Sequence, residues 1–330
     1  MKKIRHALYL LILVTAVSAC GLPSLSSPTD TAPPPTDTPV PPTLTSIPPT
    51  NTPTQTLRPF CTPPPCAANE SYYCEGDCIG GCGTVCATHT PVVFNWWQPS
   101  PGTTFHIQYD GEIDLELPVD VYNLDLFDTP AEDIQTLQAR GVRVICYFSA
   151  GSWEDWRADA ENFPPEVIGN PLEDWEGESW LDIRQQTALQ PIMAARLDLA
   201  QEKGCDAVDP DNIDGYTNNT GFEISSTDQI AYNLWLAGEA HQRGLGVGLK
   251  NDLDQVPSLV NVFDFAVNEE CYTYQECDRL MPFVWSDKAV FGIEYEADPR
   301  LFCPTADQDG FSFVLKNWEL DEFAEPCWGE

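Results

Sequence analysis

Short runs of β-branched and aromatic residues alternate with segments of helical periodicity from residue 92 to the end of the chain. The runs fall at residues 92–97, 119–126, 143–149, 207–211, 246–250, 263–268, 289–295 and 311–316. Predicted helices at 130–140, 189–203 and 227–243 each end before a glycine (Gly141, Gly204 and Gly244), a residue that forms the left-handed cap of a helix. This alternation is typical of parallel βα units.

Eight such units in about 240 residues match the usual size of a TIM-type (β/α)8 barrel. We therefore predict an α/β fold in which residues 91–330 form one barrel domain. An open, doubly wound sheet is the main alternative. No glycine-rich phosphate-binding fingerprint follows the first run, which disfavours that alternative.

The ends of nearly all these runs carry residues that a hydrophobic core would not select. The carboxyl ends of barrel strands meet at one mouth, where active sites of this fold lie. A purely structural origin would scatter such residues over both faces, so the pattern predicts one polar site. Its candidates are Trp96, Trp97, Asn123, Asp125, Ser149, Ser152, Asp209, Asp211, Asn212, Lys250, Asn251, Asp252, Asn268, Glu269, Glu270, Glu294, Lys316 and Trp318.

The first 20 residues have the pattern of a signal peptide. Lys2, Lys3 and Arg5 precede an apolar run at 8–17 that is too short for a membrane-spanning helix, which needs about 20 residues. Residues 17–20 (Val-Ser-Ala-Cys) resemble the cleavage box of bacterial lipoproteins, so we expect lipidation at Cys20 and an extracytoplasmic protein anchored at the bacterial cell surface. An ordinary secretory signal is the alternative.

Two segments separate this signal from the barrel. Residues 21–60 are rich in Pro and Thr and have little to bury, which predicts a disordered, extended linker. Residues 61–90 contain six cysteines but few apolar residues, so we expect a small segment held by disulfides. A zinc site is the alternative, because four of these cysteines recur at every fourth position.

The charge balance excludes one class of partner. The chain has 16 Lys and Arg against 51 Asp and Glu, a formal charge of −35. Binding of nucleic acid needs a basic face, so we expect no nucleic-acid partner. A negative field attracts cationic ligands, although solubility in a crowded or salty setting explains the same composition.

The residue types at the mouth restrict its chemistry. His89, His106 and His241 lie away from the predicted strand ends, so we expect no metal or cofactor, and Ser149 and Ser152 have no His nearby in sequence to activate them. Residues 209–215 resemble a calcium loop only superficially, because Ile213 and Asp214 break its ligand pattern. Carboxylates with aromatic rings suit glycoside hydrolysis, which needs one carboxylate as nucleophile or base and another as proton donor.

Several segments, in order along the chain, resemble glycoside hydrolase family 114, the endo-α-1,4-polygalactosaminidases. They are 121–128 (VYNLDLFD), 145–152 (ICYFSAGS), 177–183 (GESWLDI), 204–216 (GCDAVDPDNIDGY), 248–252 (GLKND) and 263–271 (FDFAVNEEC). The resemblance runs from about residue 94 to the end of the chain. It implies a catalytic pair at Asp211 and Glu269, and we assign Asp211 as nucleophile and Glu269 as acid/base of a retaining, endo-acting enzyme. Position 209, commonly Glu in the family, is Asp here.

The implied substrate is a partly deacetylated polymer of α-1,4-linked galactosamine, whose amines are cations. Acidic residues at the mouth then have a role in pairing with ammonium groups. We expect the substrate to contact Trp96, Trp97, Asp125, Tyr147, Asp209, Asn212, Asp214, Lys250, Asn251, Asp252, Asn268, Glu294 and Trp318. A glycosidase for another α-linked glycan and a non-catalytic glycan-binding surface protein remain open. We expect a monomer, with disulfides Cys271–Cys277 and Cys303–Cys327 and with Cys146 near Cys205.

Overall fold

The computed structural model describes residues 70–73, 85–88, 95–173 and 175–328. The chain divides into two compact units, residues 1–87 and 88–330. The described part of the first unit is a two-stranded sheet of β1 (Glu70–Tyr73) and β2 (Val85–Thr88). The predicted signal peptide with Cys20, the linker and most of the cysteine-rich segment lie outside the described residues. Among the helices that are described, none has the length and apolar character needed to cross a membrane.

The second unit is built on a curled, nine-stranded sheet in which eight strands run parallel. The order of hydrogen-bonded neighbours is β14-β13-β12-β11-β10-β9-β5-β4-β3. The parallel strands are β3 (Phe105–Gln108), β4 (Val121–Asp125), β5 (Arg143–Ser149), β9 (Ala207–Asp211), β10 (Gly246–Lys250), β11 (Phe265–Glu269), β12 (Val290–Glu294) and β13 (Ser312–Leu315). This arrangement confirms the predicted (β/α)8 barrel.

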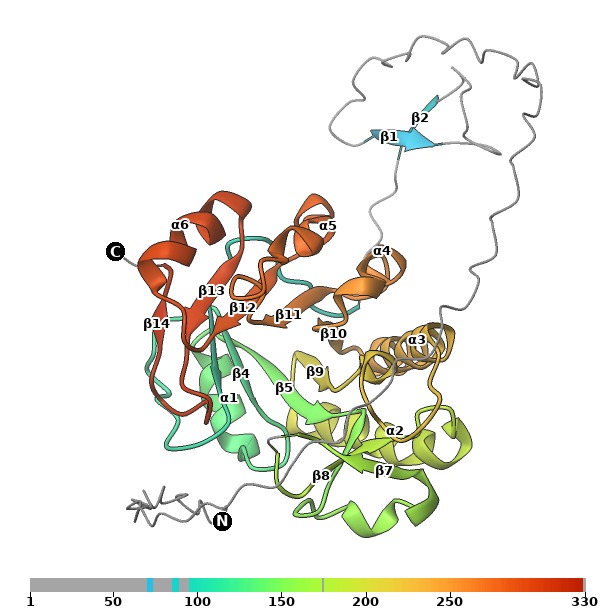
Figure 1. Ribbon diagram of the computed structural model, residues 1–330. Helices are drawn as coiled ribbons and strands as arrows, with labels where there is room; N and C mark the ends of the chain where they lie inside the picture. The colour runs from blue at the N-terminus through green and yellow to red at the C-terminus, as the bar shows by residue number, and fades with distance from the viewer. Residues whose placement is uncertain (1–69, 74–84, 89–94, 174, 329–330) are drawn as a thin grey trace, which may run out of the picture. The chain divides into compact units, whose positions relative to one another are not determined.

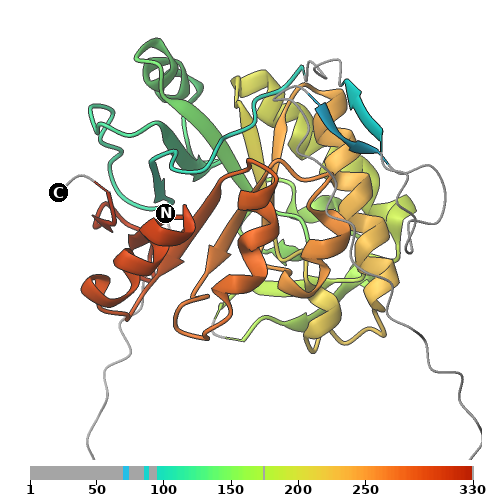
Figure 2. The same ribbon diagram turned by 90° about the horizontal axis from the view of Figure 1, so that it is seen from above.

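Helices lie outside the curled sheet (Figures 1 and 2). They are α1 (Ala131–Ala139), α2 (Gln186–Lys203), α3 (Ser226–Gln242), α4 (Val256–Leu259), α5 (Met281–Trp285) and α6 (Pro299–Asp309). Short 3-10 helices are η1 (Ala160–Asn162), η2 (Pro165–Val167), η3 (Gly215–Thr217), η4 (Leu253–Gln255) and η5 (Cys277–Leu280). As predicted, α2 ends at Gly204, whose φ of 86° is left-handed.

The first predicted strand is wrong. Residues 95–97 are not in a strand, and the first parallel strand is instead β3, some ten residues later. Instead, Trp96 and Trp97 pack at the amino-terminal end of the strands. Trp96 stacks on His241 at 3.9 Å between ring centroids, and Trp97 packs against Phe265. The other seven predicted strands match observed ones to within about two residues, as expected for boundaries of this kind.

Two hydrophobic layers follow from the alternation of side chains along each strand. Inward residues fill the barrel, among them Phe105, Ile145, Phe265 and Phe291, whereas outward residues pack under the helices. Gly248 is matched to this interior, because a Cβ at that position would lie 2.4 Å from the Phe265 ring. Beyond this apolar layer, the polar side chains of the mouth gather at the carboxyl ends of the strands.

The C-terminal segment closes the barrel between its first and last parallel strands. Strand β14 (Glu325–Pro326) pairs antiparallel with β13, and the backbone N–H of Tyr109 donates to the Leu320 carbonyl. Phe105 contacts both Phe291 and Trp328. The segment thus bridges the two edges of the parallel sheet.

An insertion between β5 and β9 forms a separate antiparallel sheet at the carboxyl end of the barrel. It contains β6 (Ser152–Glu154), β7 (Ile168–Pro171) and β8 (Glu178–Leu181), in the order β6-β8-β7. Arg157, which is buried, joins it to the barrel through a two-pronged ion pair with Asp125 and a contact with Glu154. The insertion therefore forms one fixed wall of the mouth.

Three disulfides lie in the described barrel domain. They are Cys146–Cys205, Cys271–Cys277 and Cys303–Cys327. All three agree with the prediction, including the proximity of Cys146 and Cys205 on neighbouring segments. The third bond fixes α6 to the C-terminal segment that closes the barrel.

Candidate active site

A buried lysine joins two carboxylates at the carboxyl ends of three adjacent strands. Lys250 ends β10, and its Nζ lies 3.2 Å from Asp211 Oδ2 at the end of β9 and 3.2 Å from Glu269 Oε2 at the end of β11. Only 2% of the Lys250 side chain is exposed, against 18% for Asp211 and 25% for Glu269. Burial alone would lower the pKa of Lys250, but the two carboxylates raise it, so the lysine is charged.

Glu269 is oriented by two further groups. The Tyr295 hydroxyl donates to its Oε1, and Asn251 Nδ2 donates to its Oε2 at 3.3 Å. Burial alone would raise the pKa of Glu269, but Lys250, Tyr295 and Asn251 together lower it. The Tyr295 ring stacks on Trp318 at 4.0 Å, which fixes the direction of its hydroxyl. In the free protein Glu269 is therefore ionised and held in one orientation.

Asp209 lies below this pair and has no contact with solvent. Its Oδ2 accepts from Asn123 Nδ2 at 2.8 Å and from the Tyr109 hydroxyl at 3.4 Å, whereas its Oδ1 has no partner among the described residues. Burial raises the pKa of Asp209 to about 6, against the opposing effect of Lys250. The Tyr147 ring packs between Tyr109 and the Lys250 ammonium. Asp209 and Tyr147 thus support the floor of the site.

The loop after Asp211 is attached to the insertion. Asn212, at a left-handed φ of 59°, accepts from Ser149 Oγ at 2.8 Å, and Ser149 also bonds with Ser152 at 2.6 Å. The Asn212 backbone N–H donates to Asp211 Oδ1 at 2.7 Å. These contacts hold the Asp211 carboxylate in place, and they explain the polar residues predicted at these strand ends.

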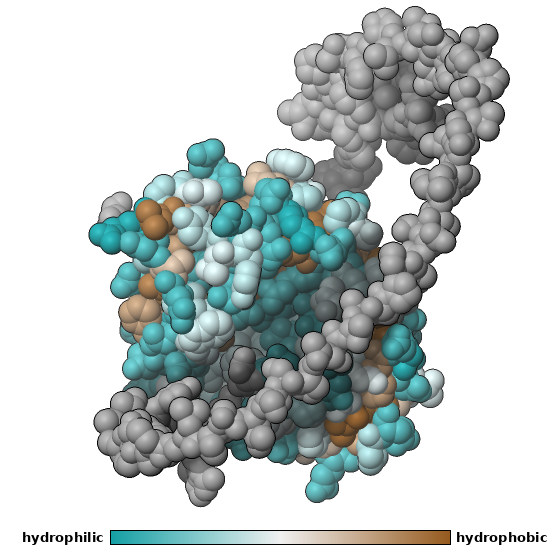
Figure 3. Space-filling model, in the orientation of Figure 1, coloured by the Kyte–Doolittle hydropathy of each residue, from teal (hydrophilic) through white to brown (hydrophobic). Residues whose placement is uncertain are grey.

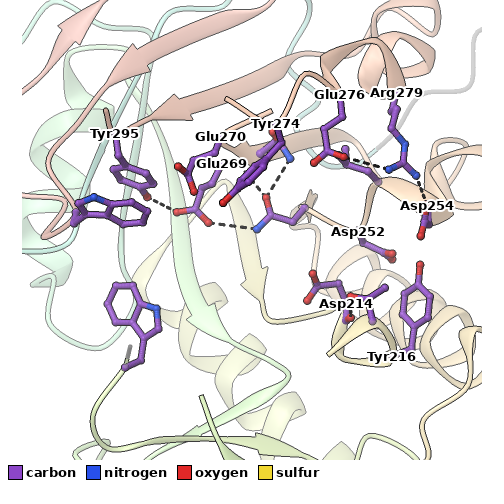
Figure 4. A pocket seen from close by; sticks show the side chains of 16 residues that line it. Asp214, Tyr216, Asp252, Asp254, Glu269, Glu270, Tyr274, Glu276, Arg279 and Tyr295 are labelled. Carbon is purple, nitrogen blue, oxygen red and sulfur yellow. Dashed lines mark hydrogen bonds and ion pairs between the residues drawn. The ribbon is translucent and has the colours of Figure 1, made fainter. Parts of the chain in front are cut away.

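Above this floor lies an open cleft of about 390 Å³ (Figure 4). Figure 3 shows a mostly hydrophilic face with a hollow near the centre of the domain. The cleft is lined by Trp175, Asp214, Tyr216, Thr217, Asn251, Asp252, Leu253, Asp254, Asn268, Glu269, Glu270, Tyr274, Glu276, Arg279, Tyr295 and Trp318. Acidic and aromatic side chains dominate this lining.

Some predicted site residues are placed elsewhere, and these predictions are corrected. Trp96 and Trp97 lie at the amino-terminal end of the strands, where Trp96 Nε1 donates to Asp264. Asp125 is at the mouth, but its carboxylate is occupied by Arg157. Glu294 is fully buried and accepts from the Tyr272 N–H and the Thr273 hydroxyl, so it holds the loop after β11.

Other predicted residues do come together at the cleft, and several were missed. Asp214, Asn251, Asp252, Asn268, Glu269 and Trp318 line it, with Asp211, Lys250, Asp209, Tyr147 and Asn212 at or below its floor. The sequence did not single out Trp175, Tyr216, Tyr274, Glu276, Arg279 or Tyr295. Tyr295 had a signal, because it lies two residues beyond inward-facing Ile293, and so had Tyr216, because it ends the family-like segment 204–216. Within the described part of the chain, no group of three or more His, Cys, Asp or Glu is arranged for a metal ion.

Comparison with known proteins gives one family. The sequence profile of glycoside hydrolase family GH114 matches residues 87–330. The structure of Aspergillus fumigatus Ega3 in complex with galactosamine is 40% identical, with a TM-score of 0.67 over 70% of this chain and 97% of that one. The glycoside hydrolase domain of PelA from Pseudomonas aeruginosa is 14% identical, with a TM-score of 0.55 over 68% of this chain and 98% of that one, which shows the fold alone. No curated protein sequence matches.

Proposed function

The protein belongs to glycoside hydrolase family GH114. We propose that it is an endo-acting enzyme that cleaves internal bonds of α-1,4-linked galactosamine polymers, with Asp211 as nucleophile and Glu269 as acid/base. The observation that carries this proposal is the pair of partly exposed carboxylates held by one lysine at the floor of an acidic, aromatic cleft. The galactosamine bound to Ega3 supports the choice of an amino sugar.

In the proposed reaction Asp211 attacks the anomeric carbon while Glu269 donates a proton to the departing glycosidic oxygen. The C–O bond breaks, and a covalent glycosyl ester forms on Asp211. Glu269, now ionised, takes a proton from water, whose oxygen attacks the same carbon and releases Asp211. Each step conserves charge and protons, and Glu269 returns to the protonated form in which it begins the cycle.

The position of Lys250 supports retention of configuration. Asp211 Oδ2 and Glu269 Oε2 each lie 3.2 Å from the same Nζ, so they can be at most twice that distance apart. Retaining glycosidases place their carboxyls about 5 to 5.5 Å apart, whereas inverting enzymes need about 6.5 to 9.5 Å to admit a water molecule. This limit on one pair of their oxygens favours the retaining arrangement.

The lowered pKa of Glu269 has a consequence for the acid step. A general acid works only in its protonated form, so this assignment predicts that kcat/KM falls as the pH rises above the acid range. The charge of the substrate gives a second expectation. Cleavage should weaken as salt screens the attraction between the acidic cleft and ammonium groups. Salt-independent cleavage of a neutral glycan would remove galactosamine as the substrate.

The decisive experiment is product analysis on defined galactosamine oligomers with the wild type, Asp211→Asn and Glu269→Gln. Both variants should lose at least about 100-fold in kcat, as expected for loss of a group acting in the transition state. Asp198→Asn and Glu239→Gln are matched controls, because these carboxylates pair with Arg243 away from the cleft. Substantial activity in either cleft variant would contradict the assignment.

Azide separates the two roles. With an activated substrate, azide takes the place of the missing nucleophile in Asp211→Gly and gives a product of inverted configuration. In Glu269→Gly it attacks the glycosyl ester and gives a product of retained configuration. The opposite pattern would exchange the roles of the two residues, and the absence of any glycosyl azide together with an inverted natural product would reject the covalent mechanism.

We also propose that the enzyme acts as a monomer anchored outside the cytoplasm through lipid on Cys20. The lipoprotein-like residues 17–20 and the Pro/Thr-rich segment that follows support this location. Replacement of Cys20 by Ala should move the protein from the membrane fraction to the medium. Unchanged membrane association would contradict the anchor, and a mass above that of one chain in sedimentation would contradict the monomer.

A further inference from the structure

Two carboxylates occupy one end of the cleft without a positive partner. Asp214 follows β9 and Asp252 follows β10, and Figure 4 places both with Tyr216 and Asp254 at the end away from Tyr295. Within the described residues, neither Asp214 nor Asp252 forms an ion pair with a Lys, Arg or His. The nearest basic groups are already paired: Lys250 with Asp211 and Glu269, and Arg279 with Asp254 and Glu276.

Asp252 has an unfavourable backbone conformation and an unsatisfied buried oxygen at this end of the cleft. Its φ of 45° is left-handed, and only 4% of the residue is exposed. Asn233 Nδ2 donates to its Oδ2 at 3.0 Å, whereas its Oδ1 has no hydrogen-bond partner among the described residues. The Tyr216 hydroxyl lies beside the Asp252 carboxylate, and its hydrogen bond with that carboxylate opposes the rise in the pKa of Asp252. A buried acceptor left unsatisfied destabilises a fold, so Asp252 Oδ1 is suited to a donor that arrives from outside.

The shape and charge of this end define the donor. An ammonium group offers three N–H donors and one positive charge, which fits the two carboxylates and the hydroxyl oxygen. An N-acetyl group at the same place is larger and neutral, and it would leave both carboxylates unpaired. The described residues contain no arrangement suited to a metal ion, so the acceptor count favours an ammonium.

The opposite end of the cleft has a different chemistry. There Trp318 stacks on Tyr295. Aromatic faces contact the C–H groups of a sugar and do not depend on the charge at its second carbon. Glu269 lies on this aromatic side of the acidic end in Figure 4. The two sides of the cleaved bond therefore meet different surroundings.

We infer that Asp214 and Asp252, with Tyr216, bind the ammonium group of a galactosamine unit on one side of the cleaved bond, whereas the aromatic side accepts a unit with or without an N-acetyl group. This inference rests on the proposed function and gives it a positional rule. The enzyme cuts a partly acetylated polymer only where a free amine occupies the acidic end. All products then share a free amine at the same one of their two new ends.

The test uses galactosamine oligomers that carry one N-acetyl group at each position in turn, with the products sequenced by mass spectrometry. Wild-type enzyme should reject acetylation at one side of the cleaved bond and accept it at the other. Asp252→Asn should lower kcat/KM on the fully deacetylated oligomer by about 10- to 100-fold, the usual loss for a charged hydrogen bond. The same variant should change little on the oligomer acetylated at the acidic end, so the positional preference disappears.

Two comparisons keep this test decisive. Asp254→Asn is the control, since this exposed neighbour is already paired with Arg279 and should keep the preference. Tyr216→Phe should weaken the preference if Asp252→Asn does not fold. Cleavage by the wild type without any positional preference would overturn this inference alone. No cleavage of any galactosamine oligomer would overturn the proposed function, and this inference with it.

Discussion

Replacement of Lys250 by Met tests whether the lysine charge controls the ionisation of the carboxylates at the floor of the cleft. Lys250 Nζ lies 3.2 Å from an oxygen of Asp211 and the same distance from an oxygen of Glu269. Unit charges about 4 Å apart interact by about 4 kcal/mol at an effective dielectric constant of about 20. Since about 1.4 kcal/mol corresponds to a tenfold change in proton affinity, this interaction sets a ceiling of about 3 pH units. Water entering the space left by the ammonium reduces the expected effect to about 1 to 2 pH units.

The assay is the pH dependence of kcat/KM on a galactosamine oligomer. One limb reports ionisation of the nucleophile and the other reports loss of the acid proton. Without the lysine Glu269 holds its proton more tightly, so the alkaline limb of the Lys250→Met profile should move to higher pH. Lys316→Met is the matched control, because Lys316 directly follows β13 and is equally buried, but its Nζ donates to the Asp321 carbonyl and forms no ion pair within the described residues. Its profile should match that of the wild type.

Stability gives a second readout for the same variant. Removing one member of a buried ion pair leaves uncompensated charge and typically destabilises a fold by about 3 to 5 kcal/mol. In Lys250→Met the folded-state pKa of Glu269 is raised, so the loss of stability should appear as the pH rises and vanish in acid, where Glu269 is protonated. A lower kcat with an unmoved pH profile would refute the reasoning and reduce Lys250 to a packing residue.

Three smaller changes test other parts of the structure. Tyr295→Phe removes the hydroxyl that donates to Glu269 but keeps the ring stacked on Trp318. The alkaline limb of the kcat/KM profile should therefore move to higher pH by less than in Lys250→Met. A limb at the wild-type pH would contradict the hydrogen bond between Tyr295 and Glu269. Burial and Asp214 raise the pKa of Asp252 to about 8, so its stability contribution falls between about pH 4 and 8, and Asp252→Asn should raise Tm at pH 8 but not at pH 4. An equal increase in Tm at pH 4 and pH 8 would show that the stabilisation by Asp252→Asn comes from packing and not from the charge of Asp252. Paired Cys303→Ser and Cys327→Ser should cost about 3 kcal/mol of unfolding free energy for a loop of this length, and an unchanged Tm would show that the barrel closes without the bond.

The pattern of apolar runs predicted most of the barrel because burial on both faces imposes it. Strands such as β5 and β12 are apolar along most of their length, so they stand out. The first strand was missed for the same physical reason. The run at 92–97 is apolar because Trp96 and Trp97 pack at the amino-terminal end of the barrel, whereas β3 contains His106 and Gln108. Hydropathy reports burial, and it does not distinguish a buried strand from a loop whose side chains pack against the end of the barrel.

The sequence predicted where several residues of the site lie better than it predicted what each of them contacts. Strand ends located Asp211, Lys250 and Glu269, because the fold brings all carboxyl ends together. What each carboxylate contacts depends on partners far along the chain. Asp125 is occupied by Arg157, which reaches it from the insertion, and nothing near Asp125 in sequence announces that pair. The aromatic and acidic ends of the cleft likewise come from loops, whose shape the sequence pattern does not specify.

The charge balance of the cleft links its architecture to its substrate. One buried lysine faces Asp211 and Glu269, with Asp209 beneath them, and the acidic end adds Asp214 and Asp252 without a cation of its own. Burial raises the pKa of Asp214 and Asp209 to about 6 and that of Asp252 to about 8, so part of this charge is suppressed by protons in the free enzyme. An arriving ammonium replaces those protons at Asp214 and Asp252. A neutral sugar cannot do so, and binding of the cationic polymer should therefore release protons from the enzyme.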